Sequence, residues 1–263
     1  MDAATPRELA DRIAERVGPH RPLIALDHDG TLSPIAPRPE DAHLAPGARA
    51  AVMRLCAVAD VVIISGRGLD DLSRRFSGLP VALVTEHGLR HRSAAGDVTW
   101  LTEGLPSTLL QQLRSRIDGT LRDHAYPPGW IVEEKDVGLA VHFRLVPPEQ
   151  REPLLHQIRS LFAEIATVGG VVQTGKAVIE IRASGATKGT ALQQLLHDHP
   201  TRIPVMIGDD ATDESALLVA EEHGGMGVLV AASARPTAAS TRVKDPAAVV
   251  ELLENLAELL SQG

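Results

Sequence analysis

The 263-residue chain is 44% hydrophobic and 23% charged, which is typical of a globular protein with one or two domains. Its net charge is −8 and it contains no long basic run, so nucleic acid is not an expected partner. No apolar run approaches the roughly 20 residues of a membrane span, and the first residues lack the pattern of a signal peptide. The single cysteine, Cys56, cannot form an internal disulfide, so we expect a cytoplasmic protein in a reducing compartment.

The first hundred residues alternate between short apolar runs and longer amphipathic stretches. Short apolar runs that end in polar turns are typical of buried parallel strands. After a helix that starts at Pro6, the pattern predicts strands at Pro22–Leu26, Asp60–Ile64 and Val81–Val84, and helices at Pro46–Ala59 and Leu69–Phe76. Strands that alternate with helices in this way predict βαβ units and a parallel sheet.

The pattern changes between residues 105 and 182, where each helix is followed by two adjacent strands. The predicted elements are a helix at Ser107–Arg122, strands at Trp130–Glu134 and Leu139–Leu145, a helix at Pro148–Ala166, and strands at Val171–Gln173 and Ala177–Arg182. This order indicates an antiparallel sheet backed by helices, which would form a separate α+β unit.

The α/β alternation returns after Ser184. The predicted elements are a helix at Thr187–His197, a strand at Ile203–Ile207, a helix capped by Thr212 that runs to Glu222, a strand at Met226–Val230 and a helix at Pro246–Leu260. We therefore predict an α/β fold, a doubly wound and mainly parallel sheet that is interrupted by an inserted α+β cap domain. The expected boundaries are residues 1–104 and 183–263 for the core and 105–182 for the cap.

Polar residues follow three of the predicted core strands. They are Asp27 and Asp29 after the first, Ser65 to Arg67 after the second, and Asp209 to Asp213 after the strand at Ile203–Ile207. In an open parallel sheet the carboxyl ends of the strands form the ligand site, so these segments should converge. The carboxylates are too few for a calcium cage and suit Mg²⁺. Lys188, at the start of a helix, could offset their charge and bind a phosphate.

Such a cluster is suited to phosphoryl transfer. One carboxylate can attack phosphorus to form an aspartyl-phosphate, and a second can protonate the leaving oxygen and then deprotonate water. Each motif alone has a simpler explanation. Asp27 to Thr31 could be a turn, Ser65 to Arg67 a loop, Lys188 a solvated lysine and Gly208 to Asp213 a capped helix entry. Their occurrence together at strand ends favours the phosphatase interpretation.

These motifs resemble those of the haloacid dehalogenase-like hydrolases, whose core is Rossmann-like. The resemblance implies that Asp27 is the nucleophile and Asp29 the general acid/base. It also implies a Mg²⁺ ion held by Asp27, Asp209 and the backbone carbonyl of Asp29, and an Asp213 that orients Lys188 or a metal-bound water. The implied phosphate-binding residues are Ser65, Gly66, Arg67 and Lys188.

Within this superfamily, the chain resembles the trehalose-6-phosphate phosphatases along nearly its whole length. The segments Val132 to Lys135, His142 to Arg144 and Gly175 to Arg182 resemble that family's cap motifs. The resemblance implies that the small-molecule partner is a phosphorylated disaccharide, trehalose 6-phosphate. The expected substrate-binding residues are Glu133, Lys135, His142, Arg144, Lys176 and Glu180.

One position departs from the family pattern and leaves alternatives open. Arg90 stands where the family often has an acidic residue, shortly after its His-Gly pair. If that position takes part in sugar recognition, the substrate could be another glycosyl phosphate or a range of sugar phosphates. A non-catalytic sugar-phosphate sensor is a third reading, although a sensor has no need for a nucleophile and an acid/base partner. The sequence leaves the oligomeric state open and is compatible with a monomer.

Overall fold

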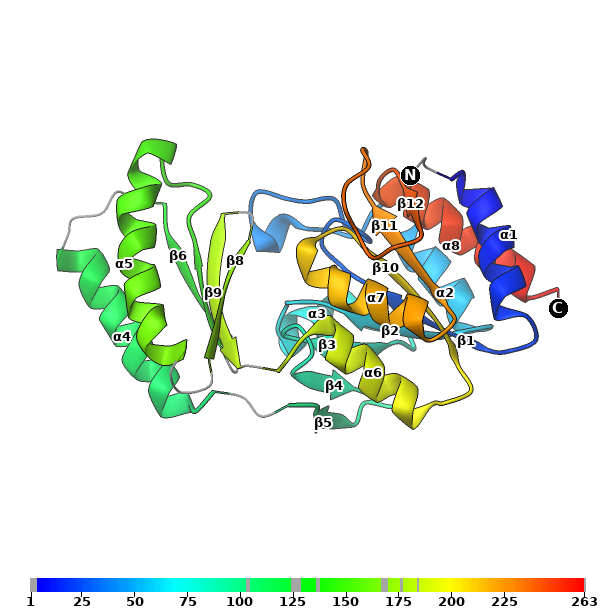
Figure 1. Ribbon diagram of the computed structural model, residues 1–263, viewed down its shortest axis with the longest axis horizontal. Coiled ribbons are helices and arrows are strands. Elements are labelled where there is room, and N and C mark those ends of the chain that lie inside the picture. Colours follow the sequence, from blue (N-terminus) through cyan, green and yellow to red (C-terminus); the bar gives the residue numbers. More distant parts are fainter. Residues whose placement is uncertain are drawn as a thin grey trace. The chain divides into compact units, whose positions relative to one another are not determined.

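The computed structural model describes residues 4–102, 105–123, 129–135, 138–166, 170–175, 177–183 and 185–262. The chain divides into two compact units, one formed by Met1–Leu101 with Thr187–Gly263 and the other by Thr102–Ala186. We call them unit 1 and unit 2. Both are drawn in Figure 1.

Unit 1 is built on an eight-stranded sheet in the order β12-β11-β10-β1-β2-β3-β4-β5. Its strands are β1 (Pro22–Leu26), β2 (Asp60–Ile64), β3 (Ala82–Thr85), β4 (Arg90–Arg92), β5 (Val98–Trp100), β10 (Ile203–Gly208), β11 (Met226–Val230) and β12 (Thr241–Val243). All neighbours pair in parallel except β3 with β4 and β4 with β5. The strand order reverses between β1 and β10, which is where open α/β sheets bind their ligands.

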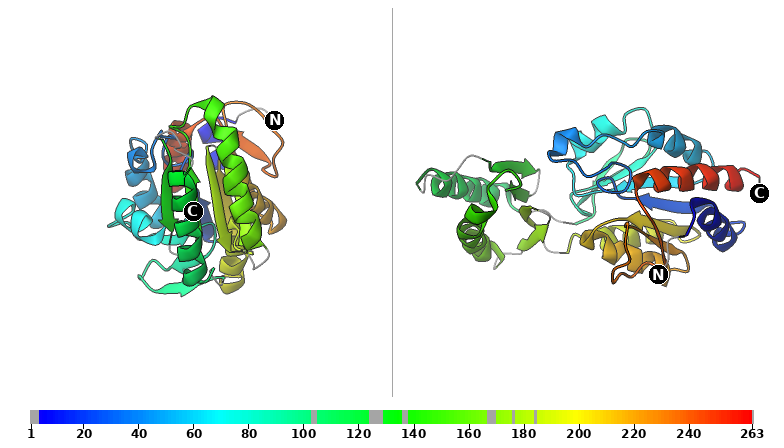
Figure 2. Two further views of the ribbon diagram at one scale, coloured as in Figure 1. Left: turned by 90° about the vertical axis from the view of Figure 1, so that its left-hand side faces the viewer. Right: turned by 90° about the horizontal axis from the view of Figure 1, so that it is seen from above.

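Helices cover both faces of this sheet (Figure 2). Those on one face are α1 (Pro6–Val17), α2 (Ala48–Cys56), α3 (Leu69–Arg75) and α8 (Pro246–Leu260), and those on the other are α6 (Lys188–Asp198) and α7 (Glu214–Glu222). Side chains of a strand point alternately to opposite faces. In β1, Ile24 and Leu26 therefore pack with the first group, whereas Leu23 and Ala25 pack with α6 and α7.

Unit 2 is a four-stranded antiparallel sheet in the order β6-β7-β9-β8. Its elements are α4 (Ser107–Asp123), β6 (Ile131–Lys135), β7 (Gly138–His142), α5 (Pro148–Ala166), β8 (Gly170–Gly175) and β9 (Val178–Ala183). Both helices lie against the same face of the sheet (Figure 1). The helices bury the apolar residues Ile117, Ile158 and Phe162, and the strands bury Leu139 and Ile181.

The predicted fold class is confirmed, because a mainly parallel α/β sheet carries a separate antiparallel α+β insert. The sequence prediction missed β4, β5 and β12, which are only three residues long and too short to show a period. It was wrong about the cap near α7. Asp210 caps a short 3-10 turn at Ala211–Asp213, through a bond from the N–H of Ala211, and α7 starts at Glu214. No helix in the described ranges is long and apolar enough to cross a membrane.

Candidate active site

The site is assembled at the ends of the three central strands β10, β1 and β2. Asp27 directly follows β1, and its N–H donates to the carbonyl of Ile207 in β10. The chain then turns tightly, because the N–H groups of Leu32 and Ser33 both donate to the carbonyl of His28. Adjacent parallel strands end at one edge, so residues distant in sequence meet there.

Lys188 links two of the predicted catalytic carboxylates. Its Nζ lies 2.6 Å from Oδ1 of Asp27 and 2.6 Å from Oδ1 of Asp213. Only 2% of Lys188, 4% of Asp27 and none of Asp213 is exposed, so the lysine is not a solvated helix-start residue. The hydroxyl of Thr187 caps α6 by accepting from the N–H of Thr190, which places Lys188 in the first helical position.

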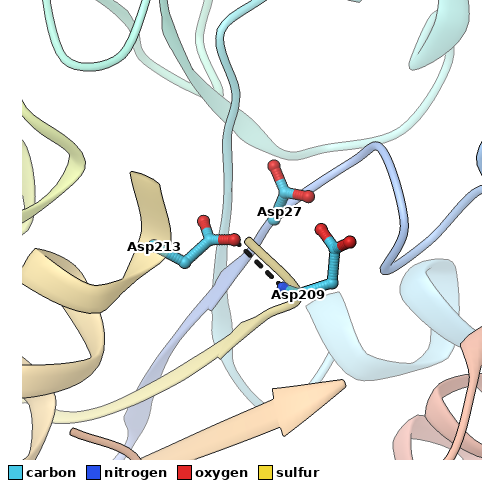
Figure 3. Close-up of side chains that lie close together, drawn as sticks. All are labelled: Asp27, Asp209 and Asp213. Atoms are coloured by element: carbon cyan, nitrogen blue, oxygen red, sulfur yellow. Dashed lines mark hydrogen bonds between the residues drawn. The ribbon is translucent and has the colours of Figure 1, made fainter. Parts of the chain in front are cut away.

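Asp209 completes a cluster of three carboxylates. One oxygen each from Asp27, Asp209 and Asp213 lies within 4.8 Å of the others, and Figure 3 shows the three side chains together. Asp213 also accepts from the N–H of Asp209 at 3.0 Å. Three carboxylates and the Lys188 ammonium give the cluster a formal net charge of −2. A hard divalent cation fits these oxygen donors and this charge.

The electrostatics of the cluster follow from its burial. Burial raises the pKa of Asp27 well above its usual value, Asp213 and Asp209 raise it further, and Lys188 offsets only part of the shift. For Lys188 burial opposes the charge, but the two carboxylates outweigh it and raise the pKa above the usual value. Lys188 therefore stays protonated, and the carboxylates still lack a compensating positive charge.

Asp29 does not join this cluster through its side chain. Arg67, which was predicted to bind phosphate, contacts both carboxylate oxygens of Asp29 with Nε and Nη2, each at 2.7 Å. Arg67 also donates to Asp71 at 2.7 Å. Burial alone would raise the pKa of Asp29, but the hydrogen bonds from Arg67 lower it. This arrangement keeps the predicted acid/base residue ionised and oriented.

Ser65 and Gly66 lie at the end of β2 against the turn that follows β3. Ser65 is buried, its hydroxyl accepts from the N–H of Arg67 at 3.3 Å, and its carbonyl accepts from the N–H of His87 at 3.0 Å. A Cβ on Gly66 would lie 2.3 Å from Nε2 of His87, so only glycine allows this approach. Glu86 and His87 both have positive φ angles, 52° and 59°, which are strained for such residues.

The structure gives Arg90 a role that the sequence did not reveal. Its Nε lies 3.5 Å from the carboxylate of the buried Glu86, and its guanidinium lies 5.0 Å from the ring centre of Trp100. Arg90 thus links the strained turn to the edge strand β5. Sequence reasoning missed this pair because β4 and β5 were not predicted, although the spacing of four residues between the two charges was visible.

His28, which lies between Asp27 and Asp29, is another residue whose contribution the sequence did not indicate. Its side chain is fully buried and meets the ring of Phe76 edge-on, with ring centres 5.6 Å apart. Within the described part of the chain, neither ring nitrogen has a hydrogen-bond partner. Burial lowers its pKa to about 4. A neutral ring is therefore part of the packing next to Asp27.

The predicted sugar-binding residues belong to unit 2. Strand pairing sets Glu133 opposite Ala140 and Ala140 opposite Glu180, so both glutamates share the sheet face that the helices leave uncovered. Nε2 of His142 lies 2.7 Å from Oε2 of Glu133, on the same face. Arg144 follows β7, and its carbonyl accepts from Arg151. Lys176 and the side chain of Lys135 lie outside the described residues.

Comparisons with known proteins agree with this architecture. A bifunctional trehalose-6-phosphate synthase/phosphatase of Thermoproteus tenax is 35% identical over 90% of this chain, which spans only 32% of that protein. A trehalose-phosphate phosphatase of Mycobacterium bovis is 33% identical over the whole chain, which spans 67% of its length. The C-terminal domain of a trehalose-6-phosphate phosphatase of C. albicans has the same fold, with a TM-score of 0.83, 23% identity and coverage of 98% and 99%. The sequence profile of the trehalose-phosphatase family matches residues 25–247, and the chain therefore belongs to this family.

Proposed function

We propose that the protein is a Mg²⁺-dependent phosphatase that hydrolyses trehalose 6-phosphate to trehalose and phosphate. The observation that carries the proposal is the buried Asp27 carboxylate held by Lys188 beside Asp209, in a chain of the trehalose-phosphatase family. The single Cys56 supports a cytoplasmic location as part of the same proposal.

In the proposed reaction Asp27 is the nucleophile and Asp29 is the general acid/base. An oxygen of Asp27 attacks phosphorus, the bond from phosphorus to the sugar oxygen breaks, and Asp29 gives that oxygen a proton. Asp29 then takes a proton from the water that hydrolyses the aspartyl-phosphate. Because Arg67 favours the ionised form of Asp29, the mechanism requires this pair to loosen when the substrate binds.

The remaining residues bind and orient. Asp27 and Asp209 would hold Mg²⁺, which neutralises phosphate charge when it is bound. Lys188 adds a fixed positive charge at the N-terminus of α6, where an anion is favoured. Asp213 orients Lys188 through the 2.6 Å contact. On unit 2, the carboxylates of Glu133 and Glu180 can accept hydrogen bonds from sugar hydroxyls.

A phosphate-release assay tests the proposal directly. The purified protein should release phosphate from trehalose 6-phosphate in the presence of Mg²⁺ and lose this activity in EDTA. The variant Asp27→Asn should lose at least about 10³-fold in kcat because the nucleophile is gone. Near-full turnover by this variant would eliminate the mechanism. Equal kcat/KM for glucose 6-phosphate and trehalose 6-phosphate would eliminate the substrate assignment.

A further inference from the structure

Glu214, the first residue of α7, fastens a loop that lies some twenty residues further along the chain. The loop comprises residues 231–240, between β11 and β12. One carboxylate oxygen of Glu214 lies 2.7 Å from Nη1 of Arg235. The other oxygen accepts from the hydroxyl of Thr237 at 2.9 Å and from the N–H of Ala238 at 2.7 Å. Both carboxylate oxygens of Glu214 thus hold this loop beside the segment from Asp209 to Asp213.

The same loop reaches the candidate metal ligand Asp209. Nη2 of Arg235 donates to the carbonyl of Asp209 at 3.2 Å. On the other side, the N–H of Asp209 donates to Asp213 at 3.0 Å. The main chain of Asp209 is therefore held on both sides. A Cβ on Gly30 would lie 2.2 Å from Cγ of Asp209, so the carboxylate has little freedom to move toward that turn.

We propose that Glu214 and Arg235 form a positioning pair that fixes the backbone of Asp209, so that its carboxylate lies where it can bind the metal together with Asp27. This inference rests on the proposed metal-dependent function and names residues that act at the same site. Arg235 touches neither substrate nor metal in this scheme. It acts through the Asp209 carbonyl, and Glu214 acts through Arg235. Partners of this kind change metal affinity about 10–100-fold when they are removed.

Glu221 provides a matched control on the same helix. Its Oε1 accepts from the N–H of Gly227 at 2.7 Å and from the N–H of Ser240 at 3.0 Å. Glu221 thus fastens the far end of the same loop with the same kind of bond. If Glu214 served only to hold the loop, substitution of either glutamate would have similar consequences.

Simple electrostatics predicts a different outcome from positioning. Removal of the negative charge of Glu214 would weaken the binding of a cation nearby, whereas removal of the positive charge of Arg235 would strengthen it. If the two residues act by holding Asp209, both substitutions weaken binding. Because they act through one another, the double variant should lose no more than a single variant loses.

The test is a titration of the protein with Mn²⁺ alone, with the free ion counted by its electron paramagnetic resonance signal. Glu214→Gln and Arg235→Gln should each weaken Mn²⁺ binding about tenfold, the double variant should match them, and Glu221→Gln should bind as the wild type does. Thermal unfolding of each metal-free protein identifies any variant that does not fold. If Glu214→Gln fails in this way, Arg235→Gln alone decides the question.

Two results would overturn the proposal. One is tighter binding of Mn²⁺ by Arg235→Gln, and the other is an equal loss of Mn²⁺ affinity in Glu214→Gln and Glu221→Gln. The titration contains no sugar phosphate, so its result does not depend on the proposed substrate. Failure of the wild type to hydrolyse trehalose 6-phosphate would count against the proposed function and leave the titration valid.

Discussion

At the scale of single residues, the charged side chains of the site are held in close ion pairs. Lys188 lies between Asp27 and Asp213, and Arg67 occupies both oxygens of Asp29. Breaking the buried contacts of Lys188 is costly because it leaves a charge unpaired in a poorly solvated place. The same burial that makes these pairs costly to disturb holds the functional groups in one geometry.

His28 makes stability depend on pH, because its folded pKa of about 4 lies below its unfolded value of about 6.5. As pH falls, the unfolded chain binds the proton first, so this contribution is fully present above pH 6.5 and is lost toward pH 4. The loss should reach about 3 kcal/mol, since one pKa unit corresponds to about 1.4 kcal/mol. Urea unfolding between pH 7 and pH 4 measures it.

The control for this prediction is His28→Leu, which keeps an apolar group against Phe76 and cannot titrate. The charged groups that influence the ring, Asp29, Arg67, Arg75 and Asp71, remain in both proteins. The wild type should therefore lose more stability with acid than the variant does. Equal slopes of unfolding free energy against pH in the two proteins would show that the ring does not titrate as described.

At the scale of elements, the turn after β1 requires a particular residue, glycine, at position 30. Gly30 has a φ of 91°, which disfavours a side chain, and the Asp209 carboxylate occupies the space where a Cβ would lie. The turn places Gly30 against Asp209, the residue that follows β10. Both the backbone conformation and the position of the Asp209 carboxylate therefore require a glycine at residue 30.

The variant Gly30→Ala should lose both stability and activity. A left-handed backbone costs about 1–3 kcal/mol, and displacement of Asp209 should lower phosphate release at subsaturating Mg²⁺. Gly96→Ala is the matched control, because Gly96 has a similar φ of 103° with nothing within 4 Å of its Cβ position. The midpoint temperature of thermal unfolding should fall in both variants, whereas phosphate release should fall only in Gly30→Ala. Equal activity of the two variants would contradict the close approach of Gly30 and Asp209.

At the scale of the whole molecule, chemistry and substrate selection are assigned to different units. The carboxylate cluster belongs entirely to unit 1, and the proposed sugar-binding carboxylates belong to unit 2. Each unit buries apolar residues of its own, such as Leu26 in unit 1 and Ile181 in unit 2. The proposed function therefore predicts that substitutions in unit 2 change substrate preference without disturbing the reacting groups of unit 1.

The variants Glu133→Ala and Glu180→Ala should each lower kcat/KM for trehalose 6-phosphate about 10–100-fold, which corresponds to the loss of a hydrogen bond to a charged group. Turnover of p-nitrophenyl phosphate should stay unchanged, because this small ester needs only unit 1. Glu134→Ala is the matched control, since Glu134 pairs with Leu139 and points to the opposite sheet face. Equal losses on both substrates would remove the assigned role of unit 2.

Much of the architecture could be predicted from the sequence. Apolar runs and helical periodicity are local properties, so the order of strands and helices, and with it the α/β sheet and its antiparallel insert, follow from the chain itself. The rule that parallel strands end at one edge then predicts a meeting of Asp27, Ser65 and Asp209, and the repulsion among the carboxylates indicates Lys188 as the cation that offsets them. The sheet face on which Glu133 lies could be predicted for the same reason, because side chains alternate between the two faces along a strand.

Only the tertiary structure decided which partner each charge meets. Nothing near Arg67 in the sequence indicates that it contacts Asp29, and nothing near Arg235 indicates that it reaches the Asp209 carbonyl. The burial of His28 against Phe76 depends likewise on elements from separate parts of the chain, and the contact of Arg90 with Trp100 depends on the pairing of β4 with β5. Local patterns determine elements, whereas pairing between distant side chains depends on how those elements pack, and that packing sets the geometry of the site.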